Sequence, residues 1–510
     1  MWFAQERPPD AIGAGFQDLP THLHNTMNIL ASEPWQGCIY SEGWQPAPER
    51  LDVIEPATGV CLTHSGLAGV ADVAAAAQRA ARAQADWVAM PPRERAEIFH
   101  RAADLFRQHA DELALFVTRE SGAILPKGQH ELREAAVFCQ QAGAMPMQAQ
   151  GQLLPSPSGR LSMARRVPHG VIGVISPFNF PLVLTLRVVA PALALGNAVI
   201  IKPDPRTPVS GGFMIARVFE AAGLPAGLLH VLPGGPQVGE ALITDPGVAM
   251  ISFTGSVGVG RRIGALAGQH LKKVSLELGG SNALVVLDDA DLDRAASAVA
   301  WGAWLHQGQI CMASNRVLVH EAIAPALTER LVAKAGHLPV GNGATAQVAL
   351  GPLIDARQRD RVHAAVQASV AAGARLLAGG RYEGLFYQPT VLADVRPGMP
   401  TFEEETFGPV INLVSFRDDE EAVRLANAHQ GGLAAGVLSA SVGRALALGQ
   451  RLRAGMVHIN DQTVNDDAVN PFGGPGVAGN GSSHGGPGDW EQFASWQWLT
   501  VREQLPTYPF

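Results

Sequence analysis

The segment Val171–Ser176 (VIGVIS) decides the fold, because it is the first of five short apolar runs that alternate with helical segments. The runs are Val171–Ser176, Ala198–Lys202, Leu228–Leu232, Met250–Thr254 and Val274–Leu278. Apolar runs of this length without polar alternation are typical of strands buried on both faces. Their starts lie roughly 20 to 30 residues apart, which is the length of a strand followed by a helix. The sequence therefore predicts an α/β fold with a doubly wound, mostly parallel sheet.

Helical and α/β patterns continue on both sides of this segment. Residues 71–145 carry alanines at helical spacing, and Pro91-Pro92 separates two predicted helices. A second α/β section runs from about 281 to about 460. Its predicted strands and helices are Ala283–Leu287, Leu292–Leu305, Arg316–Val319 and Ala322–Ala335. We expect a Gly/Pro-rich loop over Pro471–Gly488 and a late strand over Gln497–Val501.

Composition and charge narrow the class of protein. The 510 residues carry 38 Lys and Arg against 46 Asp and Glu, a net charge of −8, so nucleic acid is not an expected partner. No apolar run reaches the ~18 to 20 residues of a membrane span, so no membrane is expected either. The 4 cysteines are too few and too scattered for a disulfide framework, which favours a cytoplasmic location. Residues 1–26 show no clear periodicity, and Met27 is an alternative start.

Cys311 is the best candidate nucleophile. It follows a predicted helix and lies among small or polar residues that let a ligand approach. A thiolate attacks carbonyl carbon readily, and nearby donors or dipoles lower the pKa of a thiol. The other cysteines, Cys38, Cys61 and Cys139, are interpreted as structural, since free cysteines are often simply buried.

Glu277 and Asn179 are the candidate partners of this nucleophile. Glu277 ends a predicted strand amid apolar residues and glycines, where burial would raise its pKa and suit it to general-base work. The alternative is a carboxylate satisfied by a backbone amide or by Lys272. The Asn179 amide is placed to donate to a developing oxyanion, with the Cys311 N–H as second donor. Its alternative role is a turn or a helix cap.

The segment Gly255–Gly260 (GSVGVG) resembles a phosphate-binding loop. It ends a strand and opens a helix, whose N-terminus favours anions, although its spacing is not that of G-x-G-x-x-G. Lys202 at another strand end is placed to meet a ribose hydroxyl or a phosphate, or is simply solvated. No metal-binding motif occurs, so no catalytic metal is predicted.

Six short motifs occur in an order that resembles one enzyme family. They are Pro177-Phe178-Asn179-Phe180-Pro181, Phe253-Thr254-Gly255-Ser256, Leu276-Glu277-Leu278-Gly279-Gly280, Gly308-Gln309-Ile310-Cys311, Glu404-Glu405-Thr406-Phe407-Gly408-Pro409 and Pro471-Phe472-Gly473-Gly474. Over about residues 40–505 the chain resembles the NAD(P)-dependent aldehyde dehydrogenase superfamily. Within it, Leu186-Arg187, Lys202-Pro203-Asp204 and the closing Tyr508-Pro509-Phe510 look most like bacterial benzaldehyde dehydrogenases.

The resemblance implies an architecture. It is an aldehyde dehydrogenase-like fold of two doubly wound parallel-sheet domains plus a small β element. The implied division is an N-terminal extension at 1–39, a cofactor-binding domain at 40–152 and 169–279, a catalytic domain at 280–488, and an oligomerisation element at 153–168 and 489–510. In that element a hairpin near 153–168 pairs with the late strand and builds homodimers or homotetramers.

The resemblance also implies oxidation of a small-molecule aldehyde to a carboxylic acid with NAD or NADP. Cys311 would form a thiohemiacetal, Asn179 would hold its oxyanion, hydride would pass to the nicotinamide, and Glu277 would activate water against the thioester. The residues assigned to the cofactor are Phe178, Lys202, Asp204, Gly235, Gly255, Ser256, Gly260, Leu278, Glu405 and Phe407. Those assigned to an apolar substrate pocket, suited to an aromatic or alkyl aldehyde, are Phe180, Leu184, Ile310 and Phe472.

Two positions depart from many relatives. Pro205 replaces a glutamate that contacts the adenine ribose, and Asp204 is its partial substitute. An acidic group there disfavours a ribose 2′-phosphate, which favours NAD over NADP. Arg187 replaces a bulky apolar residue and either recognises a substrate carboxylate or pairs inside the fold.

Three alternative functions stay open. The first is an aliphatic aldehyde or semialdehyde dehydrogenase of the same family. The second is a coenzyme-A-acylating relative, which the presence of Glu277 disfavours. The third is a non-catalytic protein on the same scaffold, which the intact Cys311, Glu277 and Asn179 disfavour.

Overall fold

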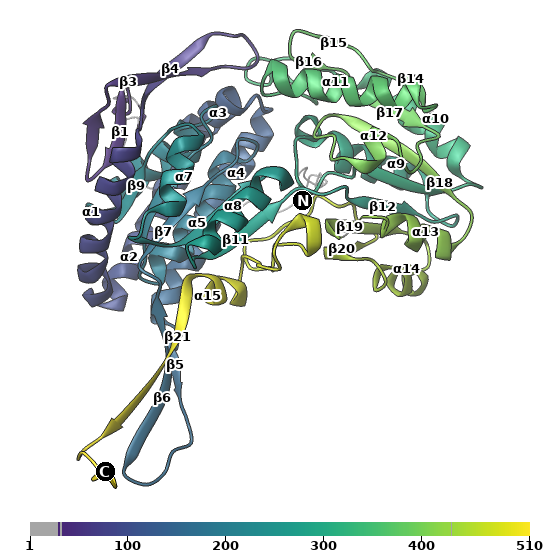
Figure 1. Cartoon of the computed structure of the whole chain (residues 1–510). Coiled ribbons are helices and arrows are strands. Elements are labelled where there is room, and N and C mark those ends of the chain that lie inside the picture. Colours follow the sequence, from purple (N-terminus) through teal and green to yellow (C-terminus); the bar gives the residue numbers. More distant parts are fainter. Residues whose placement is uncertain (1–28, 31–32, 430) are drawn as a thin grey trace, which may run out of the picture.

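Two α/β units lie side by side in the computed structural model, and a long β arm projects from one of them (Figure 1). The structure describes residues 29–30, 33–429 and 431–510. The alternative start at Met27 and the expectation for residues 1–26 lie outside the described residues. Within these residues, no helix is both long and apolar enough to cross a membrane.

The first unit is built on a seven-stranded sheet in the order β11-β10-β7-β8-β9-β1-β2. Its strands are β11 (Lys273–Leu278), β10 (Val248–Gly255), β7 (Val171–Ile175), β8 (Ala198–Lys202), β9 (Leu229–Val231), β1 (Cys38–Ser41) and β2 (Trp44–Pro46). The first five in this order are parallel, and β1 joins β9 antiparallel. The predicted parallel strands are therefore confirmed.

Helices cover both faces of this sheet, as the α/β pattern predicts. They are α1 (Val70–Ala89), α2 (Pro92–Gln108), α3 (Ala110–Ser121), α4 (Leu125–Ala144), α5 (Pro181–Ala194), α6 (Met214–Ala221), α7 (Pro236–Thr244), α8 (Val257–Gln269) and the short turns η1 (Met145–Met147) and η2 (Val209–Phe213). The predicted break at Pro91 is confirmed, but residues 71–145 form four helices and not two. Gly122 ends α3 with a φ of 69°, a left-handed conformation that glycine adopts without steric cost.

The second unit holds a seven-stranded sheet in the order β14-β17-β18-β13-β12-β19-β20. Its strands are β14 (Arg375–Ala378), β17 (Thr390–Ala393), β18 (Val410–Phe416), β13 (Arg316–His320), β12 (Ala283–Val286), β19 (Gly432–Leu438) and β20 (Ala454–Ile459). Its helices and small elements are α9 (Leu292–Trp304), η3 (Leu305–Gly308), α10 (Ala324–His337), α11 (Ala356–Ala371), β15 (Tyr382–Glu383), β16 (Phe386–Tyr387), α12 (Pro400–Glu403), α13 (Asp419–Ala426) and α14 (Val442–Gly449). Alternate residues of β12 enter two different hydrophobic clusters, so this strand is buried on both faces.

The arm is a three-stranded antiparallel sheet of β21 (Ala494–Arg502), β6 (Arg160–Pro168) and β5 (Gly151–Leu153). The predicted pairing of the hairpin with the late strand is confirmed: Gln497 lies opposite Arg165. The arm extends away from both units (Figure 1). A separate hairpin of β3 (Glu49–Ile54) and β4 (Cys61–Leu67) completes the strands, and the segment expected as a loop contains η4 (Gly476–Ala478) and the start of α15 (Pro487–Phe493).

Candidate active site

Glu277 lies near the carboxyl end of β11, opposite Thr254 of β10. The residue is buried, and neither of its carboxylate oxygens has a hydrogen-bond partner among the described residues. Burial raises the pKa of Glu277 well above its usual value, while Arg187 acts in the opposite direction. A buried carboxyl group without a structural partner is available to take a proton from a bound reactant.

Cys311 is held in a tight loop after α9 and η3. His306, Gln307 and Gly308 have φ values of 47°, 56° and 68°, so the chain turns sharply through left-handed conformations. A Cβ on Gly308 would lie 2.1 Å from the Gly408 carbonyl oxygen, so only glycine fits at this position. The Asn282 amide donates to the Cys311 carbonyl at 2.7 Å and fixes the loop from β12.

The Cys311 thiol and Glu277 share one neighbourhood. Phe472 belongs to a hydrophobic cluster against which Cys311 packs, and a Cβ on the next residue, Gly473, would lie 3.1 Å from Glu277 Oε1. Burial raises the pKa of the Cys311 thiol, and the carboxylates of Glu405 and Glu277 raise it further. The sulfur is therefore protonated at neutral pH, and it must lose its proton before it can act as a nucleophile.

Asn179 ties the turn after β7 to the cysteine loop. Its Nδ2 donates to the Gln309 carbonyl at 2.8 Å, two residues before Cys311, and the side chain is buried. An amide carries two N–H donors, and this bond occupies one of them. The arrangement leaves the second donor for a ligand beside the cysteine.

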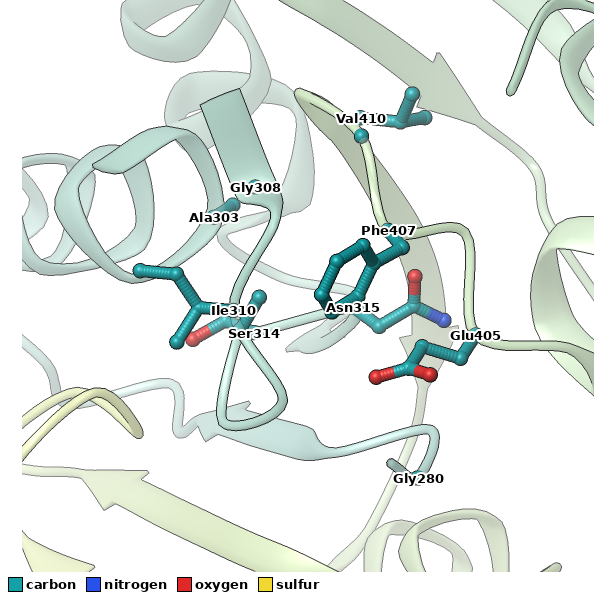
Figure 2. A pocket seen from close by; sticks show the side chains of 11 residues that line it. Gly280, Ala303, Gly308, Ile310, Ser314, Asn315, Glu405, Phe407 and Val410 are labelled. Atoms are coloured by element: carbon teal, nitrogen blue, oxygen red, sulfur yellow. The ribbon is translucent and has the colours of Figure 1, made fainter. Parts of the chain in front are cut away.

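Glu405 and Phe407 line a pocket with Ile310 of the cysteine loop (Figure 2). A Cβ on Gly279 would lie 2.1 Å from Glu405 Oε2, so the absence of a side chain at Gly279 makes room for this carboxylate. Glu405 Oε1 is buried and has no hydrogen-bond partner in the part of the chain that the structure describes, and burial raises the pKa of Glu405 to about 8. The Phe407 ring contacts the Phe178 ring edge-on, with the centroids 5.8 Å apart.

Lys202 and Asp204 lie at the end of β8, and Asp204 forms an ion pair with Arg206. The Nε and Nη2 atoms of Arg206 each bind the Asp204 carboxylate at 2.8 Å, and Nη1 binds Asp355 at the same distance. Burial raises the pKa of Asp204, but the pair with Arg206 outweighs it and holds that pKa below its usual value. The Lys202 ammonium contacts only the Pro203 carbonyl among the described residues, at 3.3 Å, which leaves it donors for a ligand.

The glycine-rich segment has the geometry of a helix N-terminus. Ser256 is the N-cap residue of α8, and its side chain caps no backbone N–H. Gly260 allows close packing, because a Cβ there would lie 2.4 Å from Leu278 Cδ2. Gly255 is the last residue of β10, and Gly235 holds the N-cap position of α7. The uncapped N–H groups of α8 can receive an anion.

Three of the four predicted pocket residues come together. Ile310 and Phe472 belong to one hydrophobic cluster, and Phe180 packs against it. Leu184 is buried in α5 but does not belong to that cluster.

Arg187 is paired inside the fold. Its Nη2 binds Asp466 Oδ2 at 2.5 Å, and its guanidinium lies 4.6 Å from the centre of the Phe472 ring. The ion pair occupies Nη2, whereas Nε and Nη1 of Arg187 are buried without a hydrogen-bond partner among the described residues.

A model of the aldehyde dehydrogenase family matches residues 44–499. The chain belongs to the aldehyde dehydrogenase family. It is 53% identical over 486 residues to a vanillin dehydrogenase of Amycolatopsis sp., covering 95% of this chain and 100% of that protein. It is 48% identical to an NAD(+) benzaldehyde dehydrogenase of Pseudomonas putida, covering 93% and 98%. A solved NADP-dependent enzyme of E. coli superposes with a TM-score of 0.89 at 32% identity, covering 92% and 99%.

As an aldehyde dehydrogenase the chain is an oxidoreductase that uses a nicotinamide dinucleotide. Sequence reasoning missed two groups in this site, Arg206 and His484. Arg206 follows Asp204 by two positions, so the local charge pattern was a usable signal. His484 gave none, because its partner Ser275 lies 209 residues away in the chain.

Proposed function

We propose that this aldehyde dehydrogenase oxidises an aromatic aldehyde to its carboxylic acid through a covalent intermediate on Cys311. The observation that carries the proposal is the common neighbourhood of a protonated thiol and an unpartnered buried carboxyl, Glu277, next to aromatic and aliphatic side chains. The apolar surroundings of Phe180, Ile310 and Phe472 suit an aryl group. The names of the relatives from Amycolatopsis and Pseudomonas putida agree with such a substrate.

The covalent half of the reaction belongs to Cys311 and Asn179. The Cys311 thiol loses its proton to solvent, and the thiolate adds to the aldehyde carbon to form a thiohemiacetal whose oxyanion needs donors. The free Asn179 N–H and the Cys311 backbone N–H supply them. A nicotinamide dinucleotide, when bound, would accept the hydride whose loss converts the thiohemiacetal into a thioester.

The hydrolytic half belongs to Glu277. A carboxylate at this position takes a proton from water, the resulting hydroxide adds to the thioester carbon, and the carboxylic acid leaves as the Cys311 sulfur departs. The carboxyl group needs a pKa near the working pH to be an effective base, and its burial moves the pKa in that direction.

The residues present fit a dinucleotide. Among the described residues, nothing bonds to one buried oxygen of Glu405, the ammonium of Lys202 has donors to spare, and the Ser256 side chain does not cap the N-terminus of α8. Glu405 and Lys202 would hold the ribose hydroxyls, and α8 would receive the pyrophosphate. Phe178, Asp204, Gly235, Gly255, Gly260, Leu278 and Phe407 would complete the contacts.

NAD is the proposed cofactor rather than NADP. Arg206 is the cation nearest to Asp204, and all three of its nitrogens already bind carboxylates of Asp204 or Asp355. It therefore has little left to offer a 2′-phosphate, and Asp204 would repel one. A kcat/KM that is higher with NADP than with NAD would overturn this assignment.

A panel of aldehydes tests the substrate class. Benzaldehyde and vanillin should give a kcat/KM at least about tenfold above those of hexanal and succinic semialdehyde, since one apolar pocket contact already contributes this factor. Succinic semialdehyde should be poorest, because Asp466 already neutralises Arg187. The highest efficiency with hexanal or with the semialdehyde would favour the aliphatic or semialdehyde alternative.

The division into domains and the assembly are also proposals. We propose a cofactor-binding domain at 40–152 and 169–279, a catalytic domain at 280–488 and an oligomerisation element at 153–168 and 489–510, and we expect a cytoplasmic homodimer or homotetramer. The arm supports this, since Trp496 and Trp498 on β21 are 51% and 66% exposed, and large exposed apolar side chains often mark interfaces. Light scattering of the purified protein should give a mass of two or four chains.

A further inference from the structure

A chain of buried hydrogen bonds runs from the surface to the neighbourhood of Glu277. Ser482 Oγ donates to Asn480 Oδ1 at 2.8 Å, and Ser275 Oγ donates to Ser482 Oγ at 3.0 Å. The next group is His484, whose Nε2 lies 3.0 Å from Ser275 Oγ. Ser275 and Glu277 are two positions apart on β11, so their side chains leave the same face of the strand.

The Asn480 amide, at the surface end of this series of hydrogen bonds, determines which group is the donor in each bond. The Asn480 amide nitrogen donates to the Val274 carbonyl at 2.8 Å, so Oδ1 of the same amide is an acceptor. The Ser482 proton must then point to Asn480, and the Ser275 proton to Ser482. Ser275 Oγ is left as an acceptor for His484, which therefore carries its proton on Nε2.

Backbone hydrogen bonds and ring stacking hold His484 in place. Its backbone N–H and carbonyl pair with those of Phe472 at 2.8 Å each. Its ring stacks on Phe493 at 5.6 Å and is buried. Burial lowers the pKa of His484 to about 3, so the ring is neutral and Nε2–H is its one donor.

This donor lies 4.0 Å from Glu277 Oε1, an oxygen that has no hydrogen-bond partner among the described residues. The separation exceeds a hydrogen-bond distance by about 1 Å, so a hydrogen bond between the two requires a shift of one side chain. Arg187 also favours the ionised form of Glu277, and Asp466 opposes it. The charges of Glu405 and Glu277 both act on the Cys311 thiol and raise its pKa.

We propose that His484 is a positioning residue for the hydrolytic half of the reaction, with its Nε2–H shared between Ser275 Oγ and the ionised carboxylate of Glu277. The inference rests on the proposed role of Glu277 as the base. A donor to the charged form lowers the pKa of a carboxyl group. His484 therefore lets Glu277 ionise at a lower pH than burial alone would allow.

The test is the pH profile of the steady-state rate that follows the first turnover, with benzaldehyde and NAD as probes. His484→Phe keeps the aromatic stacking and removes the donor. The acid limb of the profile, where the rate falls as the pH is lowered, should therefore move up by about one pH unit. Below that limb the rate of the variant should be about tenfold lower than that of the parent. His484→Gln, which restores an N–H at a similar reach, should recover most of the shift. Ser275→Ala removes the competing acceptor, so its acid limb should stay or move down.

The different pH profiles expected for His484→Phe, His484→Gln and Ser275→Ala separate this role from a structural one. An unshifted acid limb in His484→Phe, or equal shifts in His484→Phe and His484→Gln, would overturn the proposal. If His484→Phe fails to fold, the pH profile of Ser275→Ala becomes the test. An upward shift of its acid limb would overturn the proposal. The base assignment is judged separately by Glu277→Gln, whose failure to slow hydrolysis would refute the base itself.

Discussion

Two groups of buried glutamates show how differently one fold treats the same side chain. In the helical layer, Glu131 pairs with Lys127 and accepts from the backbone N–H groups of Leu182 and Val183 at 3.0 Å each. Glu120 likewise accepts from Val209 and Ser210. At the site, Glu277 is equally buried, yet both of its oxygens lack partners among the described residues.

The presence or absence of hydrogen-bond partners distinguishes a buried carboxylate with a structural role from one with a chemical role. A carboxylate that satisfies helix N-termini stabilises the fold, and its loss leaves donors unpaired. A carboxylate buried without partners costs free energy and is retained for its chemistry. Glu131 also serves the site indirectly, because it caps α5 directly after the turn that holds Asn179.

The largest expected effect is the loss of the nucleophile. Cys311→Ala should lower turnover by about 10⁴-fold or more, because no other group can form the thioester. The thermal unfolding temperature and NAD binding should stay close to those of the parent, since the half-buried thiol supports little of the fold. Cys139→Ala is the matched control, a buried cysteine away from the site, and its turnover per folded molecule should be unchanged. Turnover retained in Cys311→Ala would refute the assignment.

Glu277→Gln should slow hydrolysis by about 10²- to 10⁴-fold and leave the first oxidation much faster. Rapid mixing with aldehyde and NAD should then show a burst of NADH followed by slow turnover. The variant should be no less stable than the parent, because the neutral amide removes a buried group whose charged form is disfavoured. Marked destabilisation would mean that Glu277 is a structural acid like Glu131.

Glu131→Gln should destabilise the fold by about 3 to 5 kcal/mol, because it leaves the buried ammonium of Lys127 without its carboxylate. Urea unfolding measures this difference. Adding Lys127→Met should recover part of the loss, since the double variant buries no unpaired charge. A cost below about 1 kcal/mol would remove the contrast with Glu277.

The parallel core was predictable because it is encoded locally. Strands such as β8, Ala198–Lys202, are continuous apolar runs, and their spacing alone indicates helical crossovers. Strands such as β2, Trp44–Pro46, were missed, because three partly exposed residues leave no pattern. The extra helix breaks at His109 and Gly122 were missed for a similar reason, since a single residue carries each signal.

The candidate site was predictable only as a set of residue types in order. Cys311, Glu277 and Asn179 stand out in short motifs, whereas their contacts depend on chain segments far apart. No local pattern pairs Arg187 with Asp466, 279 positions later, or places His484 beside Ser275. These contacts decide the charge balance of the site, and only the packed structure brings them together.

The smallest expected effect is that of Glu405 on the pH dependence of the unfolding free energy. It tests whether this carboxyl group is satisfied within the fold, as that of Glu131 is. Burial raises its pKa to about 8, above the ordinary value of 4.5 that it regains on unfolding. The protonated carboxyl therefore contributes stability that is complete below pH 4.5 and is lost as the pH rises through about 8. In cofactor-free protein, Glu405→Gln should flatten the fall in unfolding free energy between these two pH values. Glu404→Gln, the exposed neighbour, is the control and should keep the parent's slope. Parallel slopes in the Glu405 variant and the parent would show that this carboxyl, like Glu131, is satisfied within the fold.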